Sequence, residues 1–200
     1  AAILLYGKYE KKVKRFMEGR EFKTRDVILL VAAIGIMVSV VALLPGQALM
    51  ILYLFAYSIL LFQFSYMAYP KWYTSIIPPA LFIVLYALLG NTAYWSPFIL
   101  DFFAVIFSII LTVYLSSMFT WKTTVVFGAF ITVVDILQTS YTRFMVGVFE
   151  KTIGLNLPVA ILVPVVPLIA LGNPPYPIFP YAFSGLGLGD LFFSGLLTIQ

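Results

Sequence analysis

The sequence predicts an all-α polytopic membrane protein with one irregular, proline-rich segment near its end. Of its 200 residues, 62% are hydrophobic and only 10% are charged. Soluble domains carry about 25% charged residues. Apolar runs follow one another with short polar gaps, and several are near the roughly 20 residues that a spanning helix needs. A soluble domain, an internal repeat and a low-complexity tract are not visible in this sequence.

The first segment, residues 7–26, contains eight of the twelve basic residues of the chain. Basic residues in short loops mark the cytoplasmic side of a membrane protein, so we expect this segment to be a cytoplasmic loop next to the bilayer. A nucleic-acid surface is the less favoured interpretation, and we expect no nucleic-acid partner.

Five apolar runs follow, and each is predicted to be a helix. They are Val27 to Leu44, Gln47 to Ala68, Tyr73 to Leu89, Ser96 to about Met118 and Thr120 to about Met145. Pro78-Pro79 should kink the third run or mark its real start. Ser96-Pro97 is typical of an N-cap followed by proline at the first helical position. Trp72, Trp95 and Trp121 fall at the ends of runs, where interfacial aromatic residues are expected.

The segment after the fifth run is irregular. Residues 138–155 alternate charged and apolar side chains, which predicts an amphipathic turn at the membrane interface with Arg143 and Lys151 reaching toward water. Residues 158–171 contain three prolines and many β-branched residues, which favour an extended or re-entrant segment over a straight helix. Residues 173–180 form a stiff, proline-rich connector.

The connector enters the sequence Gly185-Leu186-Gly187-Leu188-Gly189-Asp190, which is followed by a last apolar run. An aspartate beside an apolar run is unfavourable in a membrane and is by default a functional hypothesis. Glycines leave the backbone bare, so that an extended peptide can lie against it. We therefore predict Gly187, Leu188 and Gly189 as substrate-binding residues beside a catalytic Asp190.

A second carboxylate is available in Asp135. Beyond residue 26 the acidic residues are Asp101, Asp135, Glu150 and Asp190, and only Asp135 lies deep within a long apolar stretch. The chain has no histidine and no cysteine, which excludes Ser-His pairs, thiol nucleophiles and His- or Cys-ligated metals. Asp135 and Asp190 are thus the candidate catalytic pair. Two nearby carboxyls that share a proton can activate water and polarise a carbonyl, without a metal or cofactor. Asp101 is interpreted as a first-turn residue favoured by the helix dipole.

The motif Gly187-Leu188-Gly189-Asp190 resembles the G-x-G-D motif of the presenilin and signal-peptide-peptidase intramembrane aspartyl proteases. Asp135 falls where that family has its first catalytic aspartate, and the stretch from Asp135 to Pro158 resembles archaeal members. The resemblance implies a presenilin-like helical bundle, a multi-pass location in a prokaryotic, archaeal plasma membrane, and transmembrane peptide substrates such as signal peptides. It also implies that residues 1–200 are one transmembrane protease domain lacking most of its first helix and its C-terminal helices.

This sequence departs from the family pattern at two places. Val134 stands where the family usually has tyrosine, and the family's Pro-Ala-Leu motif does not occur before the chain ends. Two alternatives to this family stay open. Prepilin peptidases also use a G-x-G-D aspartate but usually continue with Val-Lys, whereas Leu191-Phe192 follow here. A proton- or cation-coupled transporter could use paired aspartates with the segment 158–171 as its broken helix.

Overall fold

The computed structural model is mostly helical and describes residues 6–7, 9, 12–13, 21–92, 94–164 and 183–199. Four of its helices are long and apolar enough to cross a membrane: Thr24–Leu43, Gly46–Ala68, Trp72–Leu89 and Trp121–Tyr141. Leu100–Ser116 and Leu188–Ile199 are shorter apolar helices. The prediction of a helical membrane protein is therefore confirmed at this level.

The first three predicted runs form helices close to the expected bounds. They are α2 (Thr24–Leu43), α3 (Gly46–Ala68), and a pair made of α4 (Trp72–Ser75) and α5 (Ile77–Leu89). Pro78 and Pro79 lie in the first turn of α5, where proline costs no intrahelical hydrogen bond. The prolines thus mark the start of α5, which is one of the two outcomes expected for them.

The fourth run begins differently from its prediction. A π-helical turn, η1 (Trp95–Ile99), precedes α6 (Leu100–Ser116), so Ser96 lies within a helical turn and is not an N-cap. The interfacial interpretation of Trp95 is also wrong, because this residue is fully buried, whereas Trp72 and Trp121 are exposed. Its ring packs edge-on against Tyr86 of α5, with the ring centroids 5.5 Å apart.

The fifth run forms α7 (Trp121–Ile136) and continues as the π-helical turn η2 (Leu137–Tyr141). Thr120 caps α7 by accepting a hydrogen bond from the backbone N–H of Thr123. Arg143 then takes a left-handed conformation, with φ of 55°, which turns the chain into the short helix α8 (Phe144–Gly154). This helix is the amphipathic element predicted after Asp135.

The prediction of an all-α fold needs one correction, because the structure contains a small sheet. Strands β1 (Ala160–Pro164) and β2 (Phe183–Gly187) pair antiparallel, with Ala160 opposite Gly187 and Leu162 opposite Gly185. The extended interpretation of residues 158–171 agrees with β1, and the rest of that stretch and the connector lie outside the described residues. Helix α9 (Leu188–Ile199) begins directly where β2 ends.

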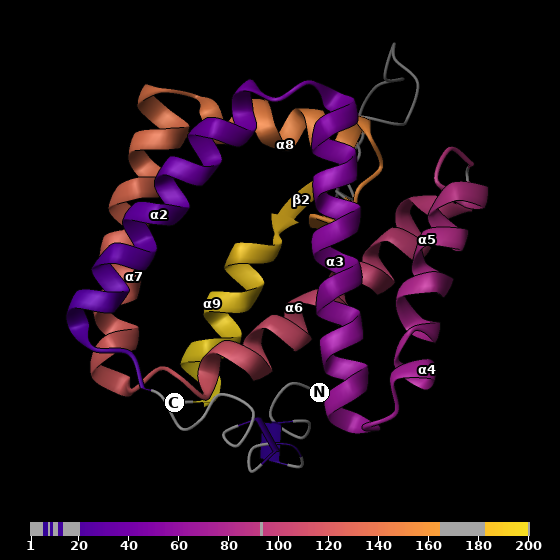
Figure 1. Ribbon diagram of the computed structural model, residues 1–200. Helices are drawn as coiled ribbons and strands as arrows, with labels where there is room; N and C mark the ends of the chain where they lie inside the picture. The colour runs from indigo at the N-terminus through magenta and orange to yellow at the C-terminus, as the bar shows by residue number, and fades with distance from the viewer. Residues whose placement is uncertain are drawn as a thin grey trace.

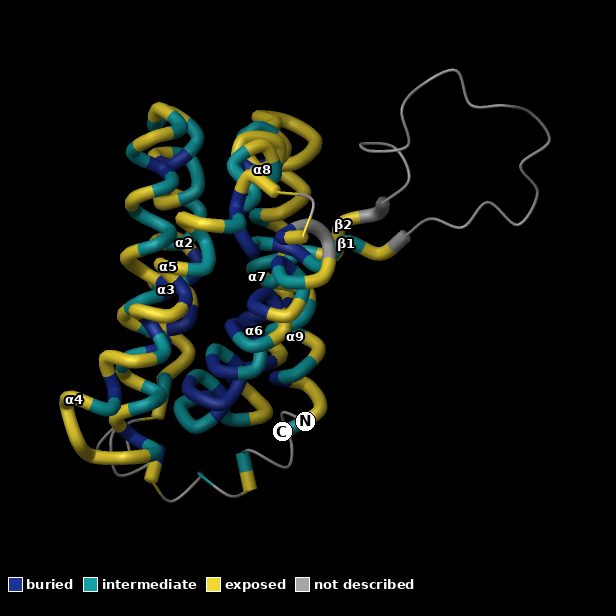
Figure 2. Tube along the Cα trace, turned by 90° about the vertical axis from the view of Figure 1, so that its right-hand side faces the viewer, coloured by how far each residue is buried: buried dark blue, intermediate teal, exposed yellow. Residues whose placement is uncertain are grey.

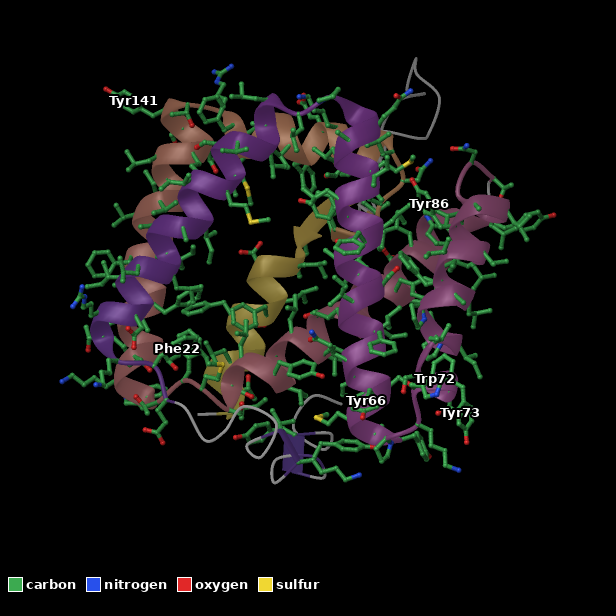
Figure 3. The ribbon with its side chains drawn as sticks, viewed as in Figure 1. Phe22, Tyr66, Trp72, Tyr73, Tyr86 and Tyr141 are labelled. Atoms are coloured by element: carbon green, nitrogen blue, oxygen red, sulfur yellow. The ribbon has the colours of Figure 1, made fainter. Side chains whose placement is uncertain are left out.

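The helices give the molecule two ends. Figure 1 shows α8 and the α2–α3 connection at one end, and α4 and the start of α7 at the other. In Figure 2, β1 and β2 lie side by side next to α6 and α9. Figure 3 places Trp72 and Tyr73 near one end and Tyr141 at the opposite end, and all three are exposed. Exposed aromatic residues at both ends are typical of the two interfaces of a membrane.

Candidate functional site

The two predicted catalytic aspartates lie on two different helices that are in contact with each other. Asp135 is in the last turn of α7, and Asp190 is in the first turn of α9. Their carboxylates are close enough for their charges to interact. Both residues are exposed within the part of the chain that the structure describes. The fold thus brings together two carboxyls that are far apart in sequence.

Close packing between α7 and α9 accounts for this approach. A Cβ added at Gly128 would lie 2.5 Å from Cζ of Phe193, so the ring of Phe193 rests on the bare backbone of α7. Gly128 precedes Asp135 by two helical turns, and Phe193 follows Asp190 by about one turn. The contact therefore lies on the faces of α7 and α9 that carry the two aspartates.

The predicted substrate-binding residues lie at the junction of β2 and α9. Gly187 is the last residue of the strand, and Leu188 and Gly189 begin the helix. The backbone N–H of Leu188 donates to the carbonyl of Val159, which makes these two residues a hydrogen-bonded pair. Hydrogen-bonded and non-hydrogen-bonded pairs alternate along an antiparallel ladder. The backbone polar groups of Gly185 and Gly187 therefore point away from β1.

The two strand glycines also share one face of the hairpin, because side-chain directions repeat every two residues in a strand. A Cβ added at Gly187 would lie 3.5 Å from Oδ2 of Asp190, and one added at Gly185 would lie 2.5 Å from Cζ of Phe149. Gly185 is thus required for packing against α8, whereas the bare position at Gly187 borders the carboxylate. The two glycines have different roles, which the motif alone does not reveal.

Three aromatic side chains hold the loop that leads into β1. Tyr86 Oη donates to the carbonyl of Leu155 at 2.7 Å, Trp95 Nε1 donates to that of Asn156 at 2.8 Å, and Tyr57 Oη donates to that of Pro158 at 3.2 Å. They come from α5, η1 and α3. Buried carbonyls need such partners, so the start of β1 is fixed to three elements of the helical core.

Asp101 has a role that the sequence analysis missed. It lies in the first turn of α6, as predicted, but its Oδ1 accepts a hydrogen bond of 2.8 Å from the backbone N–H of Leu162 in β1. A helix-dipole role alone would leave this carboxylate facing solvent. Nothing in the local sequence around Asp101 indicates a strand partner 61 positions away.

Other candidate residues serve the scaffold. Gln138 is buried and donates to the carbonyl of Gly35 at 2.7 Å, so it joins η2 to α2. Lys151 reaches back to the end of α2, where its Nζ donates to the carbonyl of Ala42 at 2.6 Å. Cations are favoured at helix C-termini, which explains this contact.

Within the described ranges, no group of three or more acidic, histidine or cysteine residues could hold a metal ion. The chain was also compared with known proteins. No protein-family profile, no curated protein and no solved structure matches it. The chemistry of the site therefore has to be argued from its own residues.

Proposed function

We propose that this protein is an intramembrane aspartyl protease that hydrolyses peptide bonds in membrane-spanning segments, of the presenilin and signal-peptide-peptidase type. The observation that carries the proposal is that Phe193 packs on Gly128, which holds α7 with Asp135 against α9 with Asp190, next to the outer edge of the glycine strand β2. The aspartate pair and the glycine strand are both needed, because two carboxyls alone would not hold a peptide in place for attack. The apolar helices support a location in a membrane, for which we propose a multi-pass arrangement in an archaeal plasma membrane.

The proposed reaction uses the two carboxyls as one unit. In the proposed mechanism the two carboxyls share one proton, because two neighbouring like charges disfavour double ionisation. The ionised carboxylate takes a proton from a water molecule, whose oxygen attacks the peptide carbonyl carbon. The protonated carboxyl donates its proton to the carbonyl oxygen, which gives a gem-diol. As the gem-diol collapses, the ionised carboxylate takes a proton from one of its hydroxyls, the C–N bond breaks, and the other carboxyl gives its proton to the leaving nitrogen. The pair is left with one proton, as at the start.

The β2 strand supports the position of the substrate in this proposal. Its outward N–H and C=O groups at Gly185 and Gly187 are arranged for a third strand, and strand addition to a free edge is a common way to bind extended peptides. Pairing there would place the peptide backbone beside Asp190, which follows Gly187 by three residues. Extended backbone is also the form in which a peptide bond can be reached, because a helix hides its carbonyls in internal hydrogen bonds.

The test is cleavage of a membrane-spanning substrate by the full-length protein in detergent or liposomes. Asp135→Asn and Asp190→Asn should each reduce the rate at least about 100-fold, because each removes a group that exchanges protons in the reaction. Both variants should keep the helical circular-dichroism spectrum of the wild type. Glu150→Gln, an exposed acid on α8, serves as the control and should cleave like the wild type.

Two results would contradict the proposal. Cleavage above about 1% of the wild-type rate in either Asn variant would exclude a mechanism that needs both carboxyls. Ion or proton flux into liposomes that depends on both aspartates, without any cleavage, would favour the transporter alternative.

A further inference from the structure

We infer that Asp101 is a positioning residue for the candidate active site: its carboxylate holds strand β1 in place, and through β1 it holds the glycine strand and Asp190. This inference rests on the proposed function for its effect on cleavage, although the position of the strand can be measured separately. Asp101 does not touch the two candidate catalytic carboxyls in the described contacts, so it is not a catalytic residue.

The sheet has two edges, one formed by β1 and the other by β2. Leu162 lies opposite Gly185, and the hydrogen bond between Leu188 and Val159 fixes which pairs bond across the ladder. By the alternation of antiparallel pairs, the N–H of Leu162 points away from β2. An unpaired backbone N–H is costly in an apolar setting, because no water is present to replace the lost partner. Asp101 supplies that partner at 2.8 Å.

The β1 edge is closed at its next outward position as well. Pro164 is two residues beyond Leu162 and has no N–H to leave unpaired. Asp101 and Pro164 thus account for two of the three outward positions of β1, and Ala160, at the third, is buried. Gly185 and Gly187 lie on the opposite edge of the sheet, and their outward backbone groups are the ones that an extended peptide can use.

Asp26 shows how a first-turn aspartate behaves without this role. It lies in the first turn of α2, and its Oδ2 accepts a hydrogen bond of 3.0 Å from the backbone N–H of Lys23, which belongs to the start of the same helix. Asp101 instead bonds a different element, 61 positions away. The comparison separates capping of a helix from fixation of a strand.

Fixation of β1 extends to Asp190 along a short path. The register pairs each residue of β1 with β2, and β2 passes into α9 without an intervening residue. Asp190 is the third residue of α9. A displacement of β1 therefore moves the first turn of α9. The C-terminal turns of α9 are held separately, because Thr112 of α6 packs against the bare backbone at Gly195.

The experiment combines hydrogen–deuterium exchange of the full-length protein with a cleavage assay. Asp101→Ala should accelerate exchange of peptides covering residues 160–163 about tenfold or more and lower kcat/KM by a similar factor, because hydrogen bonds to charged groups are among the stronger ones. Asp101→Asn retains Oδ1 as an acceptor, so it should stay within about threefold of the wild type in both measurements. Asp26→Ala, the matched control, should leave both unchanged.

The outcomes separate this inference from the proposed function. Asp190→Asn should abolish cleavage and leave exchange of β1 as in the wild type. If the wild type does not cleave at all, the proposed function fails, while faster β1 exchange in Asp101→Ala still supports the positioning role. Unchanged β1 exchange in Asp101→Ala would overturn the inference whatever the cleavage result.

If Asp101→Ala does not fold, Leu162→Pro removes the same hydrogen bond from the donor side. This variant should reproduce the faster exchange at residues 160–163, and normal exchange there would overturn the inference.

Discussion

Tyr57, Tyr86 and Trp95 each combine an apolar ring with one polar atom, and the structure uses both parts. The ring of Tyr57 stacks on Phe107 with centroids 4.1 Å apart, while its hydroxyl holds the carbonyl of Pro158. Large aromatic residues are well suited to this double role, since they bury much surface and still find a hydrogen-bond partner. These residues connect the helical core to the loop before β1.

We predict that Tyr57→Phe lowers the free energy of unfolding by about 1 kcal/mol, because it keeps the stacked ring and removes one hydrogen bond at a buried carbonyl. The measurement is unfolding by sodium dodecyl sulfate titration in mixed micelles, followed by circular dichroism. Tyr66→Phe, at a half-exposed position on the same helix, is the control and should change stability by less than about 0.5 kcal/mol. Equal effects of the two substitutions would contradict the role assigned to Tyr57.

Four single residues show what the sequence could and could not predict. Asp135 and Asp190 were selected because carboxylates are rare and unfavourable in apolar runs, and this reasoning needs no knowledge of the fold. Trp95 was misinterpreted, because its place at the end of a run is typical of an interface, and only the tertiary packing of Tyr86 and the loop at Asn156 buries it. The partner of Asp101 was missed for the same reason.

Helix α9 is packed through glycines on both sides. A Cβ added at Gly195 would lie 2.8 Å from Cγ2 and 2.9 Å from Oγ1 of Thr112 on α6. Thr112 is buried, and a β-branched side chain in a helix has little freedom to move away. On the other side, the ring of Phe193 lies against Gly128 of α7. The position of Asp190 therefore depends on close contacts along α9.

We predict that Gly195→Ala destabilises the protein by about 1–2 kcal/mol, because overpacking against Thr112 exceeds the gain in helix propensity. In a Thr112→Ala background both close atoms are absent, and the same substitution should be neutral or stabilising. Gly147→Ala on α8, where an added Cβ meets no atom within 4 Å, is the control and should not destabilise. Additive effects of Gly195→Ala and Thr112→Ala in the same unfolding assay would argue against the contact.

The elements of this protein differ in how far the sequence determines them. Long apolar runs bounded by proline, glycine or polar residues predicted α2 and α3 to within a few residues, and the start of α7, whereas α7 ends at Ile136, well before the predicted end near Met145. The strand β2 was not predicted, because Gly185 and Gly187 have low strand propensity and the pairing partner lies about 25 positions earlier in the chain. Its extended form comes from the register with β1, which is tertiary information.

Among the residues that the structure describes, basic side chains are distributed unevenly between the two ends of the molecule. Lys12 bonds the last residue of α3, next to α4, and Lys23 and Arg25 lie at the start of α2. Lys71 and Lys122 lie at the end that carries α4 and the start of α7, which is also the end where α2 begins after its basic segment (Figure 1). Arg143 and Lys151 lie at the α8 end. Because basic residues are retained on the cytoplasmic side, we expect the α4 end to face the cytoplasm.

Cysteine labelling tests this orientation, because the chain has no native cysteine. Lys71 and Asn91 are both exposed and flank the candidate span Trp72–Leu89. In intact cells, an impermeant maleimide should label Asn91→Cys, and it should label Lys71→Cys only after the membrane is permeabilised. Labelling of both sites from outside would contradict the span, and the reverse pattern would contradict the orientation. The orientation matters for the proposed function, since it sets which direction of a spanning segment fits the dyad.

The small sheet has a consequence for finding ligands. A lone two-stranded hairpin is only marginally stable, so a peptide that adds a third strand at β2 would complete it. Any ligand that binds only the folded form raises apparent stability, by about 2.7 kcal/mol at a concentration 100 times its dissociation constant. Peptides that pair with β2 and resist cleavage should therefore raise the melting temperature in proportion to the logarithm of their concentration. A thermal-shift screen of extended apolar peptides could identify sequence preferences before any natural substrate is known.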